Sequence, residues 1–137
     1  MAGESDFQWQ DEYSVGIFEI DRQHQEIIKL INDLSLLCAV DNSKSYDTFK
    51  IMLFSAAEYL QNHFWSEEVR MKSSDYPEFL EHKKRHVEMA HKINEMANNI
   101  GKDDSLTIKS VTEYFREWYR EHLLSWDKEM GEYFIKN

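Results

Sequence analysis

Seven side chains in this sequence are of types that bind metal ions, and their spacing suits helices. His63 precedes Glu67 by four residues and His82 precedes His86 by four, so each pair projects from one helical face. Imidazole and carboxylate groups together suit iron, manganese or zinc. The complete set, called here the histidine–carboxylate cluster, is His24, His63, Glu67, His82, His86, His122 and Asp127.

The cluster residues fall on helical faces that the apolar periodicity assigns to a protein core. A lone histidine in a core is more often a hydrogen-bonded structural residue than a metal ligand. Two carboxylates buried among imidazoles are a different case, because without a cation each buried charge would cost several kcal/mol. We therefore predict a buried metal site.

The number of donors predicts more than one ion. Seven donors exceed the need of a single ion, a structural zinc site usually stops at four ligands, and two carboxylates can bridge a pair of ions. Two ions with these donors leave room for a small bridging oxygen ligand and one open position. On a redox metal, an open position is where a diatomic gas binds.

Amphipathic periodicity predicts four helices that position the cluster, at about 21–40, 46–72, 77–100 and 106–126. An extended apolar arm (1–16) precedes them, and a short C-terminal segment (127–137) follows. In an antiparallel up-and-down bundle, the first and third helices start where the second and fourth end, so the seven side chains meet in one layer. We therefore expect an all-α fold in a single domain of 137 residues, an antiparallel up-and-down four-helix bundle with an N-terminal arm.

Residues that favour helix ends mark the expected boundaries. Asp21 is a candidate N-cap of the first helix, and 41–45 reads as a polar turn. Pro77 suits the first position of the third helix, and Gly101 suits its C-terminal cap.

The fourth helix cannot be regular if both of its cluster residues are to reach the site. His122 and Asp127 are five residues apart, so on a regular helix they would point roughly 140° apart. We therefore predict that the helix ends, bulges or tightens around 125–127.

Composition limits the remaining possibilities. The single cysteine, Cys38, excludes an intrachain disulfide and a thiolate metal site, and we expect it to be a buried core thiol. The formal net charge of -10 argues against nucleic acid and anionic membranes as partners. The N-terminus has no signal-peptide pattern and no apolar run is long enough to span a membrane, so we expect a cytoplasmic protein.

Four stretches of the chain resemble the hemerythrin family, specifically its single-domain bacterial members: VGIFEIDRQH, HFWSEE, HKKRH and HLLSWD. Together they span nearly the whole chain. The resemblance implies a four-helix bundle with a non-haem di-iron centre, bridged also by an oxo or hydroxo group, that binds dioxygen end-on and reversibly. The implied ligands are three histidines on one iron (His82, His86, His122), two on the iron with the open site (His24, His63), and two bridging carboxylates (Glu67, Asp127).

Three classes of function use such a centre. The resemblance favours dioxygen binding for storage, transport or buffering, with nitric oxide and other small anions or gases as further candidate ligands. The alternative is sensing of oxygen, nitric oxide or redox state for a signalling partner, whose identity stays open. A di-iron oxidase or peroxidase is the third class, but a ferritin-like site needs two Glu-x-x-His motifs. The single such pairing, Glu88 with His91, lies off the cluster layer, so we expect neither an enzyme nor catalytic residues.

The sequence departs from the family pattern beside the fourth-helix histidine. The family often has a leucine after the tryptophan one turn earlier, whereas Trp118 is followed here by Tyr119. A phenol near the gas pocket could donate a hydrogen bond or admit a proton. Trp126, just before the bridging aspartate, is also atypical. The candidates for lining the oxygen pocket are Trp118, Tyr119, Phe64 and Ile27.

Overall fold

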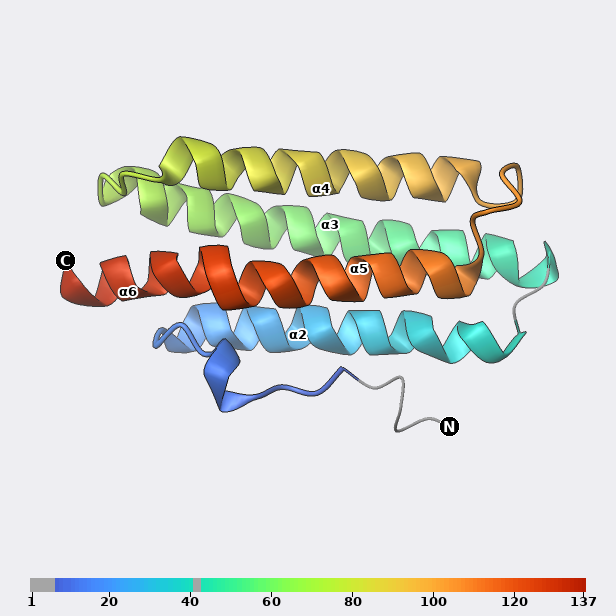
Figure 1. Cartoon of the computed structure of the whole chain (residues 1–137), viewed down its shortest axis with the longest axis horizontal. Coiled ribbons are helices and arrows are strands. Elements are labelled where there is room, and N and C mark those ends of the chain that lie inside the picture. Colours follow the sequence, from blue (N-terminus) through green and yellow to red (C-terminus); the bar gives the residue numbers. More distant parts are fainter. Residues whose placement is uncertain (1–6, 41–42) are drawn as a thin grey trace.

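The computed structural model describes residues 7–40 and 43–137. Four long helices form a bundle in which each helix runs antiparallel to the one before it in the chain (Figure 1). Helix α3 packs against α4 and α2, and α2 also packs against α5. The helices are α2 (Phe18–Ser35), α3 (Ser43–Ser73), α4 (Phe79–Asn99) and α5 (Ile108–His122), which α6 (Lys128–Lys136) continues. The predicted all-α four-helix bundle is confirmed. Among the described residues, no helix is long and apolar enough to cross a membrane.

Helix α2 begins at Phe18, three residues before the predicted cap. Asp21 is not the N-cap, because its backbone N–H already donates to the carbonyl of Ile17. Its carboxylate instead accepts hydrogen bonds from Ser14 Oγ (2.5 Å) and Val15 N (2.8 Å). The aspartate therefore fixes the arm against the first turn of α2.

The end of α2 tightens into a 3-10 turn, Leu36–Val40. Cys38 lies in this turn and is partly buried against the core, rather than fully buried as predicted. Of the predicted polar turn 41–45, residues 41–42 lie outside the described part of the chain and 43–45 are already helical.

Two of the other helix starts also differ from their predicted positions. Pro77 lies in the turn before α4, which begins at Phe79. Helix α5 begins after Thr107, whose hydroxyl accepts a hydrogen bond from Ser110 N (3.0 Å) while Ser110 Oγ accepts one from Thr107 N (2.9 Å). This reciprocal capping satisfies two backbone N–H groups at the helix start. Gly101 follows the end of α4 with φ +88°, as the predicted glycine cap requires.

The described part of the N-terminal arm packs along the bundle. Phe7 and Tyr13 are buried, and the backbone N and O of Phe7 bond to the side-chain amide of Asn32 (2.7 and 2.8 Å). The arm then crosses α6 at Gly131, where a Cβ atom would lie 2.5 Å from Val15 Cβ. The glycine thus permits this close approach. The segment after 127, expected to be a short tail, is a helix that the arm covers.

Candidate metal centre

The structure brings all seven residues of the histidine–carboxylate cluster together at one end of the bundle. Helix α2 contributes one residue, α3 and α4 two each, α5 one, and the turn after α5 one. Every member is at most 3% exposed. Polar groups this deeply buried need partners, because each charge left unpaired in the interior costs several kcal/mol.

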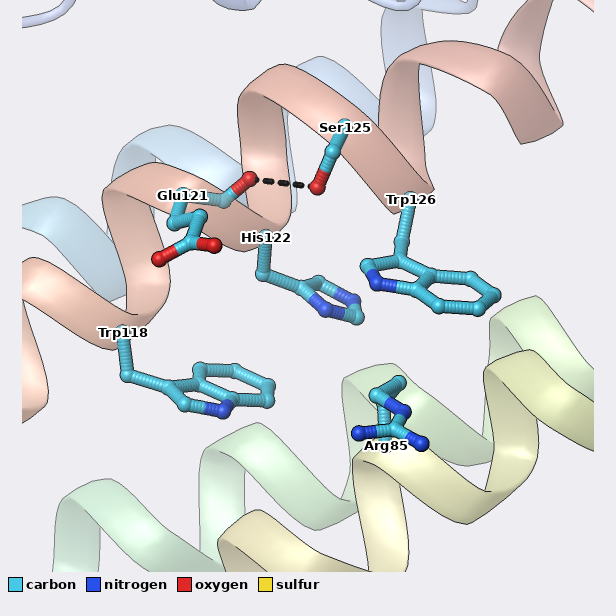
Figure 2. Close-up of a pocket in the computed structure, with 6 residues that line it drawn as sticks. All are labelled: Arg85, Trp118, Glu121, His122, Ser125 and Trp126. Carbon is cyan, nitrogen blue, oxygen red and sulfur yellow. Dashed lines mark hydrogen bonds between the residues drawn. The ribbon is translucent and has the colours of Figure 1, made fainter.

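A π turn, Leu123–Asp127, interrupts the helix between its two cluster residues. This turn confirms the predicted break. A π turn has more residues per turn than an α-helix, so His122 and Asp127 share one face and His122 Nε2 lies 3.1 Å from Asp127 Oδ1. Ser125 Oγ donates a hydrogen bond to the carbonyl of Glu121 (2.7 Å) within the turn (Figure 2).

Three histidines meet on one side of the cluster, called here the three-histidine half (His82, His86, His122). The Nε2 atoms of His82 and His122 each lie 3.1 Å from Asp127 Oδ1 and 3.1 Å from one another. His86 Nε2 lies 3.4 Å from Glu67 Oε1. All three imidazoles therefore point the same ring nitrogen at one small volume.

The other side of the cluster, the two-histidine half, holds His24 and His63. Both Nε2 atoms lie 3.0 Å from Glu67 Oε2, and His24 Nε2 lies 3.2 Å from Asp127 Oδ2. Each carboxylate thus turns one oxygen toward each half. Glu67 belongs to both groups of donors whose ligand atoms lie within 4.8 Å of one another.

Several of these buried donor atoms have no hydrogen-bond partner among the described residues. They are His63 Nε2, His86 Nε2, Glu67 Oε1 and Asp127 Oδ2. A buried polar atom without a partner costs about 1–3 kcal/mol, and native proteins retain few of them. Cations between the donors would satisfy all four atoms, so the arrangement fits a metal site with two positions that share the carboxylates.

The carboxylates are ionised without any metal. Burial alone would raise the pKa of Glu67, but the nearby imidazoles of His63, His24 and His86 hold it well below the usual value. Burial and the charge of Glu67 would raise the pKa of Asp127, yet His122 and His24 hold it below its usual range. Two anions therefore face the space between the imidazoles, and they favour a cation there.

His86 carries a proton when the site holds no metal. Burial would lower the pKa of His86, but its close approach to the carboxylates of Glu67 and Glu68 outweighs burial and raises the pKa to about 9. In contrast, burial lowers the pKa of His122 despite the nearby Asp127. A metal bound at the three-histidine half would therefore displace a proton from His86.

Comparison with known proteins agrees with this site. The family model of the hemerythrin HHE cation binding domain matches residues 15–134. The chain belongs to the hemerythrin family.

Individual hemerythrins are similar over most of their length. A bacteriohemerythrin of Clostridium acetobutylicum is 28% identical over 125 residues, covering 90% of this chain and 97% of the relative. A bacteriohemerythrin of Stenotrophomonas maltophilia is 25% identical, covering 83% and 87%. A myohemerythrin of Theromyzon tessulatum is 25% identical over 88% of each chain.

Two side chains that orient histidines of this hemerythrin were not predicted from the sequence. His63 Nδ1 lies 2.6 Å from Gln23 Oε1, and His86 Nδ1 lies 2.8 Å from Glu68 Oε2. An Nδ1–H group donated to these oxygens leaves Nε2 free to bind a metal. Gln23 and Glu68 directly neighbour cluster residues in the sequence, and that adjacency was the available signal.

Aromatic rings cover the outside of the three-histidine half of this hemerythrin. The Phe64 ring stacks on His86 (centroids 3.8 Å apart, planes 5° apart), and Trp118 stacks on His122 (4.6 Å, 12°). Figure 2 shows the His122 ring between Trp118 and Trp126, at a pocket of about 150 Å³. The pocket is lined by Arg85, Trp118, Glu121, His122, Ser125 and Trp126.

The remaining pocket candidates point into the bundle. Ile27 is a buried core residue. Tyr119 is fully buried, and its ring meets His24 edge-on with centroids 6.1 Å apart. Burial, together with the charges of Asp127 and Glu67, holds the pKa of Tyr119 well above its usual value, so the phenol keeps its proton. Trp118 and Tyr119 are adjacent in the sequence, yet their rings contact histidines of different halves of the cluster, His122 and His24 respectively.

Proposed function

We propose that this hemerythrin binds two iron ions in the histidine–carboxylate cluster and binds dioxygen reversibly there, for oxygen storage, transport or buffering. One observation carries the proposal: seven buried donors form two groups that share a carboxylate. Membership of the hemerythrin family supports iron over the other metals that the same donors suit. The relatives' names, bacteriohemerythrin and myohemerythrin, support it further.

The number of donors in each half indicates which proposed iron ion has an open position. The iron pair, when bound, supplies the electrons that a reversible dioxygen carrier needs. The three-histidine half, with both carboxylates, offers five donors, whereas the two-histidine half offers four. The open position therefore belongs to the two-histidine half. The proposed iron ligands are His82, His86 and His122 on one ion, His24 and His63 on the other, and Glu67 and Asp127 as bridges, with an oxo or hydroxo group as a third bridge.

The surroundings of the cluster support binding rather than oxidation of a substrate. Buried apolar side chains surround the cluster. Of the candidates for the oxygen pocket (Trp118, Tyr119, Phe64 and Ile27), Tyr119 and Phe64 have ring contacts with His24 and His63 of the two-histidine half, respectively, whereas Trp118 stacks on His122. A ferritin-like oxidase needs two Glu-x-x-His motifs. Glu88 and His91 are both exposed on α4, outside the cluster. Fewer anionic donors also stabilise high-valent iron less, which favours reversible binding.

The test is anaerobic loading with ferrous iron, followed by visible spectra after adding oxygen and after purging it. We expect two irons per chain and a charge-transfer band that appears and disappears reversibly. A band that decays quickly to an oxidised state would favour the sensing alternative. One ion per chain, or none, would contradict the di-iron proposal.

A further inference from the structure

Tyr119 of α5 has a hydroxyl group with no hydrogen-bond partner among the described residues. Its side chain is fully buried. A buried tyrosine hydroxyl usually finds a partner, and one left without costs about 1–3 kcal/mol. A group retained at that cost in the interior is a candidate for contact with a ligand.

The position of Tyr119 associates this hydroxyl group with the two-histidine half. The ring meets His24 edge-on, at 81° between planes. The phenol interacts electrostatically with Asp127, Glu67 and Tyr59, and Tyr59 lies on α3 one turn before His63. The phenol therefore lies on the His24 side of the cluster, and it is not among the residues that line the pocket beside Trp118 and Trp126.

The surrounding groups leave the hydroxyl a free donor. A phenol has one O–H donor and can also accept. None of the groups in electrostatic range, including both carboxylates, forms a hydrogen bond with it in the described structure. A small ligand bound at the two-histidine half would supply, with its lone pairs, the hydrogen-bond acceptor that this hydroxyl lacks.

We propose that the Tyr119 hydroxyl donates a hydrogen bond to a small ligand bound at the two-histidine half, and so selects ligands with an acceptor end, such as dioxygen and small anions. This inference rests on the proposed di-iron function. Tyr119 is a specificity-determining residue in this view, since it contributes no metal donor.

A packing role is the competing explanation, and the chain contains a matched control. Tyr76 also carries a buried hydroxyl without a hydrogen-bond partner among the described residues. Its ring packs on Tyr133 and Phe134 (centroids 5.0 and 6.3 Å) in a separate apolar cluster. Tyr76→Phe therefore removes the same atom from a core position whose ring packs on Tyr133 and Phe134 rather than on a cluster histidine, although its phenol is in electrostatic range of Asp127.

The probe is sodium azide, added to the iron(III)-loaded protein, because azide is a small anion that carries no proton of its own. The native protein, Tyr119→Phe and Tyr76→Phe are compared for iron content, azide affinity and the azide vibrational frequency in H₂O and D₂O. Thermal unfolding of the metal-free proteins shows whether each variant folds.

We expect Tyr119→Phe to keep two irons. Its azide affinity should fall about tenfold or more, because the variant loses a hydrogen bond to a charged acceptor. The native protein should show a D₂O-induced frequency shift that Tyr119→Phe lacks and Tyr76→Phe retains. The metal-free variant should be no less stable than the native chain, because an unsatisfied hydroxyl is removed.

Two results would overturn the inference, and they differ in what else they affect. If Tyr119→Phe keeps two irons, normal azide affinity and the D₂O shift, the hydrogen bond is absent while the proposed function stands. If the native protein takes up no iron or no azide, the proposed function fails and the inference fails with it.

Discussion

The two halves of the cluster differ in what surrounds their imidazoles. In the three-histidine half, rings lie nearly parallel to ligand rings, Phe64 on His86 and Trp118 on His122. In the two-histidine half, the aromatic side chain beside His24 is Tyr119, which meets the imidazole edge-on at 81° and whose hydroxyl has no hydrogen-bond partner among the described residues. Stacked, apolar cover fixes ligands in place, whereas edge-on rings beside a polar group suit a position where a ligand comes and goes.

The hydrogen-bond partners of the ligands show the same contrast. The outer nitrogen of His86 faces a carboxylate, Glu68, whereas that of His63 faces a neutral amide, Gln23. An anionic partner makes the imidazole a stronger donor to a metal. We infer that the three-histidine half holds its ion more tightly than the two-histidine half.

The largest effect is expected from replacing Glu67, a carboxylate that both halves share. Glu67→Ala should reduce bound iron from two ions per chain to less than one, because Glu67 is in both donor groups. Iron analysis after anaerobic loading measures this. Glu88→Ala, an exposed glutamate on α4, is the control and should load normally. Full loading of Glu67→Ala would remove the bridging role.

A smaller change should separate the halves. His63→Ala should lose the ion of the two-histidine half and with it the oxygen-dependent band, while retaining one iron on the five donors that remain on the other side. Iron content and visible spectra distinguish the two ions. His91→Ala, which alters an exposed histidine on α4, should change neither quantity. Two irons with normal gas binding in His63→Ala would show that the ligand assignment is wrong.

Changing the partners of the histidines should weaken iron binding without abolishing it. Glu68→Gln and Gln23→Met should each lower metal affinity about 10–100-fold, the usual effect of losing such a partner. Competition with a chelator measures the affinity of each half. The contrast between the halves predicts that Glu68→Gln affects the more tightly held ion and Gln23→Met the more weakly held one. The reverse order would contradict our inference about which half is tighter.

The last expected effect is a dependence of metal affinity on pH. The raised pKa of His86, about 9, means that the metal-free site is protonated at neutral pH. Metal affinity of the three-histidine half should therefore rise by up to about tenfold per pH unit between pH 7 and 9 and level off above. In the metal-free chain, the same proton stabilises the fold below pH 6.5, and this stabilisation is lost as pH rises through about 9. Titration calorimetry in buffers of different ionisation enthalpy measures the released proton, and its absence would contradict the prediction.

The sequence predicted the parts of the site that follow from position along a helix. The four-residue spacings and the apolar stripes placed all seven side chains in one layer, and the five-residue spacing of His122 and Asp127 required the break now seen as a π turn. These features depend on the geometry of single helices, which repeats regularly.

The features that were missed depend on contacts between elements. Asp21 was predicted to cap α2. Its carboxylate instead accepts hydrogen bonds from Ser14 and Val15 of the N-terminal arm, an irregular segment. Gln23 and Glu68 find their histidines across neighbouring helices, so their roles depend on how each helix is rotated about its axis. Cys38 is only partly buried because it lies in a 3-10 turn, which the apolar periodicity of a regular α-helix does not predict.

The π turn Leu123–Asp127 also constrains the length of the chain at this point. A π turn is equivalent to an α-helix with one residue inserted. Winding the same residues as a regular α-helix would rotate all that follows by about 100° relative to the present structure. Asp127 would turn away from His122, and Gly131 would no longer meet the arm. Deleting Leu124, whose side chain is 42% exposed, would instead leave His122 and the aspartate four residues apart, the spacing at which a regular helix keeps both on one face. A one-residue deletion should therefore be better tolerated inside this turn than within α5.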